Sequence, residues 1–159
     1  KDLKIKLLPD GSIRLNGEDV SSAIRANEVS MGASIVSQYA KVRSFLVAQQ
    51  REMAKGGGVI LDGRDIGTVV LPDAELKIYQ VASVETRAKR RYKENIEKGI
   101  ECDYEEMKAE IEARDKQDMN REVSPLKKAD DAIELDTSNM SLEEVVAHVM
   151  DLVEKKLEE

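Results

Sequence analysis

The sequence is poor in cysteine, histidine and aromatic residues. Its 159 residues include one Cys, one His and no Trp, and aromatic side chains make up 3% of the chain. The single cysteine, Cys102, has no partner for an internal disulfide, and His148 alone cannot complete a zinc site with it. These absences exclude a disulfide scaffold and a zinc module. They also argue against a protein that stacks nucleobases on exposed aromatic rings.

Long apolar runs are missing as well. No run approaches the roughly 20 residues that a membrane-spanning helix needs, and the start of the chain lacks the apolar stretch of a signal peptide. We therefore expect no membrane partner and a soluble, intracellular protein. Hydrophobic residues make up 41% and charged residues 36% of the chain, which is enough apolar material for a folded core.

The net charge of −7 is unevenly distributed. Residues 83–98 carry six basic side chains against three acidic ones, whereas residues 134–159 carry eight acidic side chains against two lysines. An acidic chain whose basic segment lacks interleaved aromatics is a poor match to nucleic-acid-binding proteins. We therefore expect no nucleic-acid partner.

Hydrophobic periodicity predicts strands at four places. Residues 3–16 alternate around Pro9-Asp10-Gly11, which is typical of a β-hairpin. The unbroken apolar run at 59–61 indicates a strand buried on both faces. Residues 76–81 and 132–135 are predicted to form further strands.

Apolar spacing and capping signals predict helices between these strands. Apolar residues recur at steps of three and four from residue 34 to about 54 and predict one helix there, ended by glycines 56–58. Ser83 is predicted to cap one helix, and Asp103 with Glu106 and Ser141 with Glu144 have the spacing of a capping box. Strands alternating with helices predict an α/β fold with a parallel sheet covered by helices.

The loop after the predicted strand at 59–61 is the first candidate site. Its sequence is Asp62-Gly63-Arg64-Asp65-Ile66-Gly67, at the carboxyl end of a strand, where α/β proteins bind ligands. The glycines would allow a ligand to approach closely, and Arg64 could bind a phosphate with its forked guanidinium group. A plain turn with a local Arg–Asp pair is the alternative.

Two arginine clusters are further candidates. Arg114, Asp118 and Arg121 fall within roughly a 60° arc of one helix, and their surroundings are polar on nearly every side. Solvent-exposed ion pairs on a helix are the alternative, and the spacing of this triad taken alone favours them. The second cluster, Arg87, Arg90 and Arg91, is either a plain solvated surface or a lid that closes over a polyphosphate.

Taken together, these segments resemble the bacterial cytidylate kinases, a family of P-loop nucleoside monophosphate kinases. Four stretches carry the resemblance: residues 15–20, residues 34–43, the run from Asp62 to Ala74 containing Gly-Arg-Asp-Ile-Gly-Thr-Val-Val, and the run from Arg114 to Leu126. The resemblance covers the whole chain. It implies an enzyme that transfers the γ-phosphoryl group of ATP to CMP or dCMP with Mg²⁺.

The resemblance also implies roles for individual residues. Cytosine would be read by Ser34, Arg43 and Asp65, the CMP phosphate would be bound by Arg64 and Arg121, and the sugar would contact Arg114 and Asp118. Arg87, Arg90 and Arg91 would act on the phosphates of ATP and on the transferring group from a lid at about 87–104. Asp62 would orient a water on magnesium. By the same resemblance, residues 1–33 would belong to a nucleoside-monophosphate-binding insert, residues 34–159 would form the core α/β domain, and the protein would be a monomer.

One motif of that family is absent. The chain contains no Gly-x-x-x-x-Gly-Lys-Ser/Thr segment, the loop that cradles the phosphates of ATP. In the family this loop and the central strand of the sheet lie upstream of the segments matched here. We therefore expect the chain to be the C-terminal part of a longer kinase and to be inactive alone. The alternative is a catalytically dead domain that retains a CMP pocket.

Overall fold

The computed structural model describes residues 3–158, with the side chains of residues 27 and 30 left out. The chain forms two compact units, Lys1–Leu46 and Val47–Glu159. The helix over residues 40–54 crosses the boundary between them. Each unit is described by itself below.

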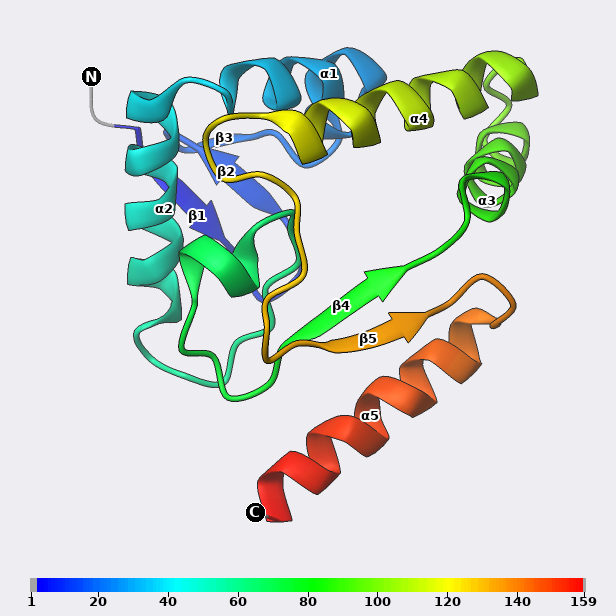
Figure 1. Cartoon of the computed structure of the whole chain (residues 1–159). Helices are drawn as coiled ribbons and strands as arrows, with labels where there is room; N and C mark the ends of the chain where they lie inside the picture. Colours follow the sequence, from blue (N-terminus) through cyan, green and yellow to red (C-terminus); the bar gives the residue numbers. More distant parts are fainter. Residues whose placement is uncertain (1–2, 159) are drawn as a thin grey trace. The chain divides into compact units, whose positions relative to one another are not determined.

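The first unit contains a small antiparallel sheet in the order β1-β2-β3 (Figure 1). Ile5 pairs with Leu15 and Leu7 pairs with Ile13, which confirms the predicted hairpin. The third strand was not predicted. The elements of this unit are β1 (Ile5–Leu7), β2 (Ile13–Leu15), β3 (Glu18–Asp19), the 3₁₀ helix η1 (Ala23–Arg25), α1 (Asn27–Val36) and the start of α2 (Ala40–Ala54).

The single helix predicted over residues 34–54 is wrong, because two helices occupy this region. α1 ends at Val36, and α2 begins at Ala40. The hydroxyl group of Ser37 donates a hydrogen bond to the carbonyl of Ser34 at 2.8 Å and helps to close the end of α1. The apolar spacing continues across the short break, so periodicity alone could not reveal it. The predicted end is confirmed, since α2 ends at Ala54 before the glycines.

The second unit contains a parallel pair of strands (Figure 1). The register runs from Ile78 opposite Ile133 to Val81 opposite Asp136, which confirms the prediction of parallel strands joined through helices. The elements of this unit are the π-helix η2 (Ile66–Val70), β4 (Ile78–Val81), α3 (Val84–Glu97), α4 (Tyr104–Asn120), β5 (Ile133–Asp136) and α5 (Leu142–Glu158).

The strand predicted at 59–61 is not formed. These residues have no regular secondary structure, and Ile60 is 94% exposed. A strand is stable only when its backbone N–H and C=O groups pair with a neighbour. Within residues 3–158 the two sheets contain β1–β3 and β4–β5 only, so this apolar run has no partner strand.

The three predicted caps are confirmed. The side chain of Ser83 accepts a hydrogen bond from the Thr86 amide at 3.1 Å, and Asp103 accepts one from the Glu106 amide at 2.9 Å. At α5 the Ser141 hydroxyl accepts from the Glu144 amide, and the Glu144 carboxylate accepts from the Ser141 amide. This reciprocal arrangement is a capping box.

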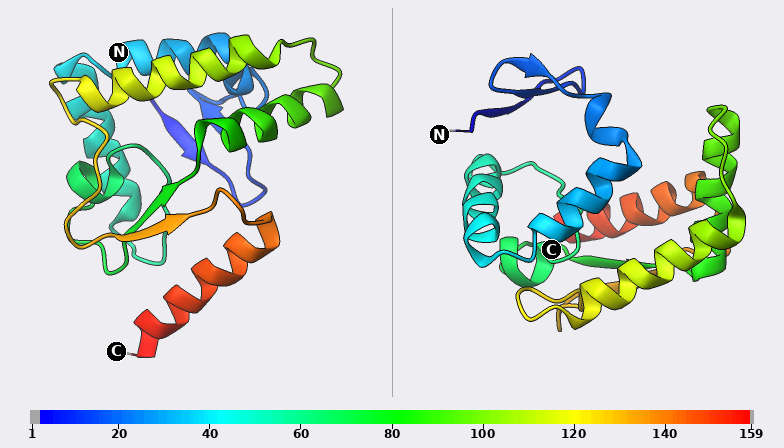
Figure 2. Two further views of the ribbon diagram at one scale, coloured as in Figure 1. Left: turned by 45° about the vertical axis from the view of Figure 1, so that its right-hand side comes forward. Right: turned by 90° about the horizontal axis from the view of Figure 1, so that it is seen from above.

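Helices α3 and α4 form a hairpin in which the two helices lie side by side (Figure 2). Gly99, at the turn between them, has a φ of +68°, a conformation that favours glycine at the end of a helix. Ala88 of α3 and Met107 of α4 are buried. The hairpin brings the basic face of α3 next to the polar C-terminal half of α4.

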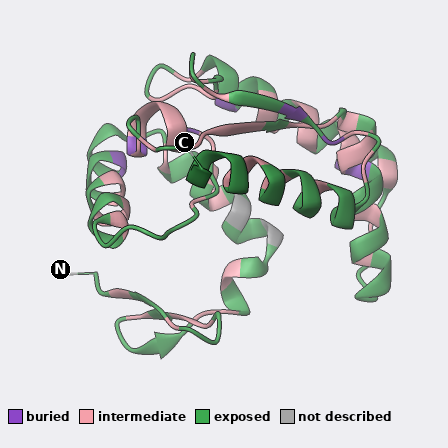
Figure 3. Cartoon of the chain, turned by 90° about the horizontal axis from the view of Figure 1, so that it is seen from below, coloured by how far each residue is buried: buried purple, intermediate pink, exposed green. Residues whose placement is uncertain are grey.

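Burial in the second unit is uneven (Figure 3). Val70, Leu135 and Thr137 are nearly inaccessible, whereas α5 has no buried residue among those described. The apolar side chains of α5 are largely exposed at Leu142 and Leu157. None of the helices within residues 3–158 has both the length and the apolar character needed to cross a membrane.

The cap of α3 gives a testable stability prediction. Replacing Ser83 with alanine removes the acceptor for the Thr86 amide, and we expect the free energy of unfolding to fall by about 1 kcal/mol. Ser83→Gly should cost only about a few tenths of a kcal/mol, since glycine is tolerated at this position. Urea denaturation of the two variants measures the difference. Equal losses would show that the side-chain oxygen does not stabilise the helix.

Candidate functional site

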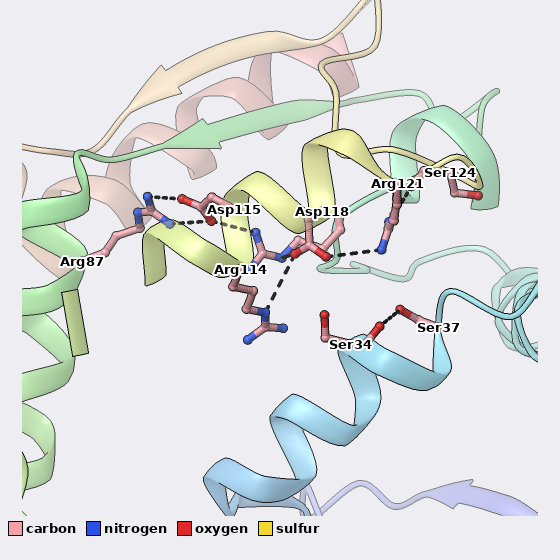
Figure 4. A network of polar contacts seen from close by, with 9 residues as sticks. Ser34, Ser37, Arg87, Arg114, Asp115, Asp118, Arg121 and Ser124 are labelled. Carbon is pink, nitrogen blue, oxygen red and sulfur yellow. Dashed lines mark hydrogen bonds and ion pairs between the residues drawn. The ribbon is translucent and has the colours of Figure 1, made fainter. Parts of the chain in front are cut away.

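The carboxylate of Asp118 is the centre of a cluster of arginines. Asp118 lies near the C-terminal end of α4, and its side chain is 4% exposed. Its Oδ2 atom lies 3.4 Å from Nε of Arg64 and 3.9 Å from Nε of Arg114, and its Oδ1 atom lies 3.5 Å from Nη1 of Arg121. Figure 4 shows Asp118 between Arg114 and Arg121. The prediction that Arg114, Asp118 and Arg121 share one helix face is therefore confirmed.

Arg121 is held where α4 ends. Its side chain is 7% exposed, and its Nε atom donates a hydrogen bond to the carbonyl of Ser124 at 2.5 Å. Its Nη2 atom is buried and makes no hydrogen bond. A buried guanidinium N–H group without an acceptor lowers the stability of the folded state. A bound group that offers an acceptor at this position would therefore stabilise the site, and the described residues do not supply one.

A second carboxylate connects the cluster to α3. The two oxygens of Asp115 accept hydrogen bonds from Nη1 and Nη2 of Arg87 at 3.1 and 2.5 Å. Asp115 Oδ1 also lies 3.6 Å from Nη1 of Arg64. Arg64 is therefore placed between the two aspartates. Figure 4 shows the paired contact between Arg87 and Asp115.

Positive charge exceeds negative charge in this cluster. Within residues 3–158, four arginines form their ion pairs with two carboxylates, Asp115 and Asp118; these arginines are Arg64, Arg87, Arg114 and Arg121. Burial, and after it the positive charge of Arg64, lowers the pKa of Arg114 below the ordinary arginine value. An excess of partly desolvated guanidinium groups is the usual composition of a phosphate site.

The segment that carries Arg64 and Asp65 is fixed by packing and by a distant arginine. Asp65 is 7% exposed and precedes the π-helix η2, a type of helix that is frequent at functional sites. Arg51 of α2 donates hydrogen bonds to the carbonyls of Val70 and Val69 at 2.8 and 2.7 Å. A Cβ atom at Gly63 would lie 2.9 Å from the Ile66 side chain, so this glycine serves close packing of the segment.

The other predicted lid arginines have different surroundings. Arg90 of α3 donates through Nη2 to the carbonyls of Thr137 and Met140 at 2.6 and 3.0 Å, and so connects α3 to the loop after β5. Arg91 lies close enough to Arg114 for its charge to lower the pKa of that arginine, after the larger effects of burial and of Arg64.

Ser34 and Arg43 belong to the first unit. Ser34 lies on α1 and its carbonyl accepts the hydrogen bond from Ser37, which Figure 4 also shows. Arg43 is a buried residue of α2. Their predicted role in reading cytosine stays a prediction.

The described residues offer little to a metal ion. Within residues 3–158 no group of three His, Cys, Asp or Glu side chains is placed to hold one. Asp62 is exposed, and its carboxylate would be one ligand for Mg²⁺. At a bound nucleotide Mg²⁺ takes its other ligands from phosphates and water. We therefore derive no chemical step through magnesium.

Sequence reasoning missed two residues of this site. Asp115 belongs to the polar run between Arg114 and Arg121, and nothing in that run distinguishes it from its neighbours, because its partner Arg87 lies 28 residues away. Arg51 gave no local signal, because its partners lie 18 and 19 residues away.

Comparison with known proteins adds an independent line of evidence. Residues 1–155 match the family model described as cytidylate kinase. The chain is 56% identical over 155 residues to a cytidylate kinase of Streptococcus pyogenes serotype M4, covering 96% of this chain and 69% of that protein. It is 58% identical over 139 residues to a cytidylate kinase of Bacillus cereus strain B4264, covering 87% of this chain and 62% of that protein. The chain thus spans about two thirds of the length of these relatives.

Proposed function

The chain belongs to the cytidylate kinase family of nucleoside monophosphate kinases, and we propose that the arginine cluster around Asp118 binds the monophosphate substrate. The reaction proposed for the full-length protein is transfer of the γ-phosphoryl group of ATP to CMP or dCMP, which gives ADP and CDP or dCDP. The observation that carries the proposal is the buried Nη2 atom of Arg121, which has no hydrogen-bond acceptor in a cluster with excess positive charge.

Arg64 and Arg121 are the proposed ligands of the CMP phosphate. Both are ion-paired to Asp118, so their guanidinium groups are held in place before the phosphate binds. Two arginines on one phosphate reduce its repulsion from the phosphates of ATP and hold the attacking oxygen in line. Positioning and charge neutralisation of this kind account for most of the catalysis in phosphoryl transfer.

Asp118 and Arg114 are the proposed contacts of the sugar. Asp118 Oδ2 is buried and accepts no hydrogen bond, and Arg114 Nε is buried and donates none. A ribose hydroxyl group can donate to a carboxylate and accept from a guanidinium group at once. One hydroxyl placed between these two atoms would therefore satisfy both.

Asp65 is the proposed reader of the cytosine amino group, together with Ser34 and Arg43. The amino group of cytosine donates a hydrogen bond, whereas uracil presents a carbonyl acceptor at the same position. A buried carboxylate facing that carbonyl would have no donor between the two oxygens. We therefore expect discrimination against UMP.

Isothermal titration of the full-length protein with CMP and UMP tests this proposal. We expect CMP to bind at least about tenfold more tightly than UMP. Asp65→Asn should reduce the difference, because an amide group can donate to the uracil carbonyl. Asp62→Asn, at an exposed position three residues earlier, is the matched control and should leave the preference unchanged. Equal affinity of the wild-type protein for CMP and UMP would contradict the role of Asp65.

Binding of the donor is proposed on the family resemblance. ATP with Mg²⁺ would supply the phosphoryl group, and Arg87, Arg90 and Arg91 would contact its phosphates from the lid at about 87–104. Arg90 would have to give up its hydrogen bonds to the carbonyls of Thr137 and Met140 to do so. A monomer in the cytoplasm is part of the same proposal.

A nucleotide-binding domain without catalysis is the second candidate. It is favoured by one observation, the absence of Gly-x-x-x-x-Gly-Lys-Ser/Thr from the sequence. A coupled assay of ADP release with ATP and CMP separates the two candidates in the native protein. CMP binding without ADP release would favour the second.

A further inference from the structure

Asp115 connects two groups of arginines that come from different parts of the second unit. On one side it accepts two hydrogen bonds from Arg87 of α3. On the other side it faces Arg64, which also contacts Asp118. Asp115 is therefore the carboxylate that connects α3 to the proposed phosphate site.

From this arrangement we infer that Asp115 is a positioning residue, which fixes the guanidinium group of Arg87 beside Arg64 so that both act on phosphate groups during transfer. The inference rests on the proposed function and extends it to a residue without an assigned role.

Hydrogen bonds hold the guanidinium group of Arg87 in one position and orientation. Its Nε atom donates to the carbonyl of Ala82 at 3.1 Å, and both of its Nη atoms donate to Asp115. Such a paired contact fixes the plane of a guanidinium group as well as its position. Without the carboxylate, Arg87 would keep only the Ala82 contact and would repel Arg64.

Arg64 responds differently to the loss of Asp115. Its Nε atom still faces Asp118 Oδ2 at 3.4 Å, so one anchor remains. We therefore expect loss of Asp115 to weaken CMP binding little and to slow phosphoryl transfer strongly.

A role of Asp115 in charge balance alone would predict a different change in CMP affinity. A carboxylate in an anion site repels the incoming phosphate, so its removal should tighten binding if Asp115 did nothing more than offset positive charge. The direction of the change in CMP affinity and the change in kcat together separate positioning from charge balance.

Asp115→Asn in the full-length protein is the test, because the amide group keeps the shape and cannot accept the paired hydrogen bond. Glu85→Gln is the matched control, since Glu85 of α3 forms the other described ion pair between the two helices, with Lys108 of α4 at 3.1 Å. The measurements are the dissociation constant of CMP without ATP, kcat with both substrates, and the melting temperature.

We expect Asp115→Asn to lower kcat at least about tenfold and to change the CMP dissociation constant less than about threefold. Glu85→Gln should leave kcat within about twofold of wild type, because an exposed pair contributes little. Asp115→Glu should restore part of the lost rate. Arg87→Lys keeps the charge without the fork and should lower kcat as Asp115→Asn does, with no further loss in the double variant.

Three outcomes would overturn the inference. The first is a kcat for Asp115→Asn within about fivefold of the Glu85→Gln value. The second is tighter CMP binding by Asp115→Asn with an unchanged kcat. The third is a CMP affinity of Asp115→Asn that falls in proportion to its kcat. If Asp115→Asn does not fold, Asp115→Glu takes its place: moving the carboxylate by one methylene group should lower kcat at least about threefold with CMP affinity unchanged, and an unchanged kcat would overturn the inference. A wild-type protein that does not bind CMP would overturn the proposed function and this inference with it, whereas normal wild-type binding with an unaffected Asp115→Asn overturns the inference alone.

Discussion

Replacing Arg121 with alanine is expected to lower kcat/KM for CMP by about 10²–10³-fold in the full-length protein. The side chain is nearly inaccessible and ends in a buried Nη2 atom without an acceptor. In the proposed function, the phosphate of the substrate supplies the acceptor that this atom lacks. Loss of the Arg121 side chain would remove both a hydrogen bond and a positive charge from the proposed phosphate site.

Two further variants show whether the effect belongs to the site. Arg121→Lys keeps the positive charge without the forked geometry and should retain part of the activity, because lysine binds phosphate as a point charge. Glu122→Ala, at the exposed neighbouring position, should leave kcat/KM unchanged. Steady-state kinetics and melting curves are the measurements. Loss of cooperative unfolding in Arg121→Ala would instead make Arg121 a residue of the scaffold.

Replacing Asp118 with alanine is expected to lower the free energy of unfolding by about 3–5 kcal/mol. The carboxylate is 4% exposed and faces three guanidinium groups. Its removal leaves these positive charges close together in a partly desolvated site, where repulsion is screened weakly. The same variant should also lose the proposed contact with the sugar.

Asp151→Ala is the matched control for this prediction. Asp151 of α5 pairs with Lys155 at 2.7 Å, but both side chains are more than half exposed. An exposed pair of this kind contributes about 0–1 kcal/mol. Denaturation by urea should therefore separate the two variants clearly. A loss for Asp118→Ala no larger than that for Asp151→Ala would show that the arginines do not depend on this carboxylate.

Most of the elements that the sequence predicted correctly have stabilising contacts that are local. The caps at Ser83, Asp103 and Ser141 each use a partner three residues away. The alternation around Pro9-Asp10-Gly11 likewise fixes a hairpin from neighbouring residues. Helical spacing alone also predicts that Arg114 and Arg121 lie next to Asp118, because all three residues lie within two turns.

Two of the three errors concern features that depend on distant residues. The run at 59–61 has the composition of a buried strand, yet pairing with another strand decides whether one forms, and composition does not reveal the partner. The short break after Val36 leaves the apolar spacing almost intact. The contact between Asp115 and Arg87 spans 28 residues and requires the α3–α4 hairpin, which only the fold reveals.

A crystal structure of the full-length protein with CMP bound tests the central claim most directly. The account predicts that the phosphate lies within hydrogen-bond distance of Arg64 and of Nη2 of Arg121, and that a sugar hydroxyl group lies against Asp118. A CMP phosphate bound elsewhere, with the Nη2 atom of Arg121 still lacking an acceptor, would contradict the account.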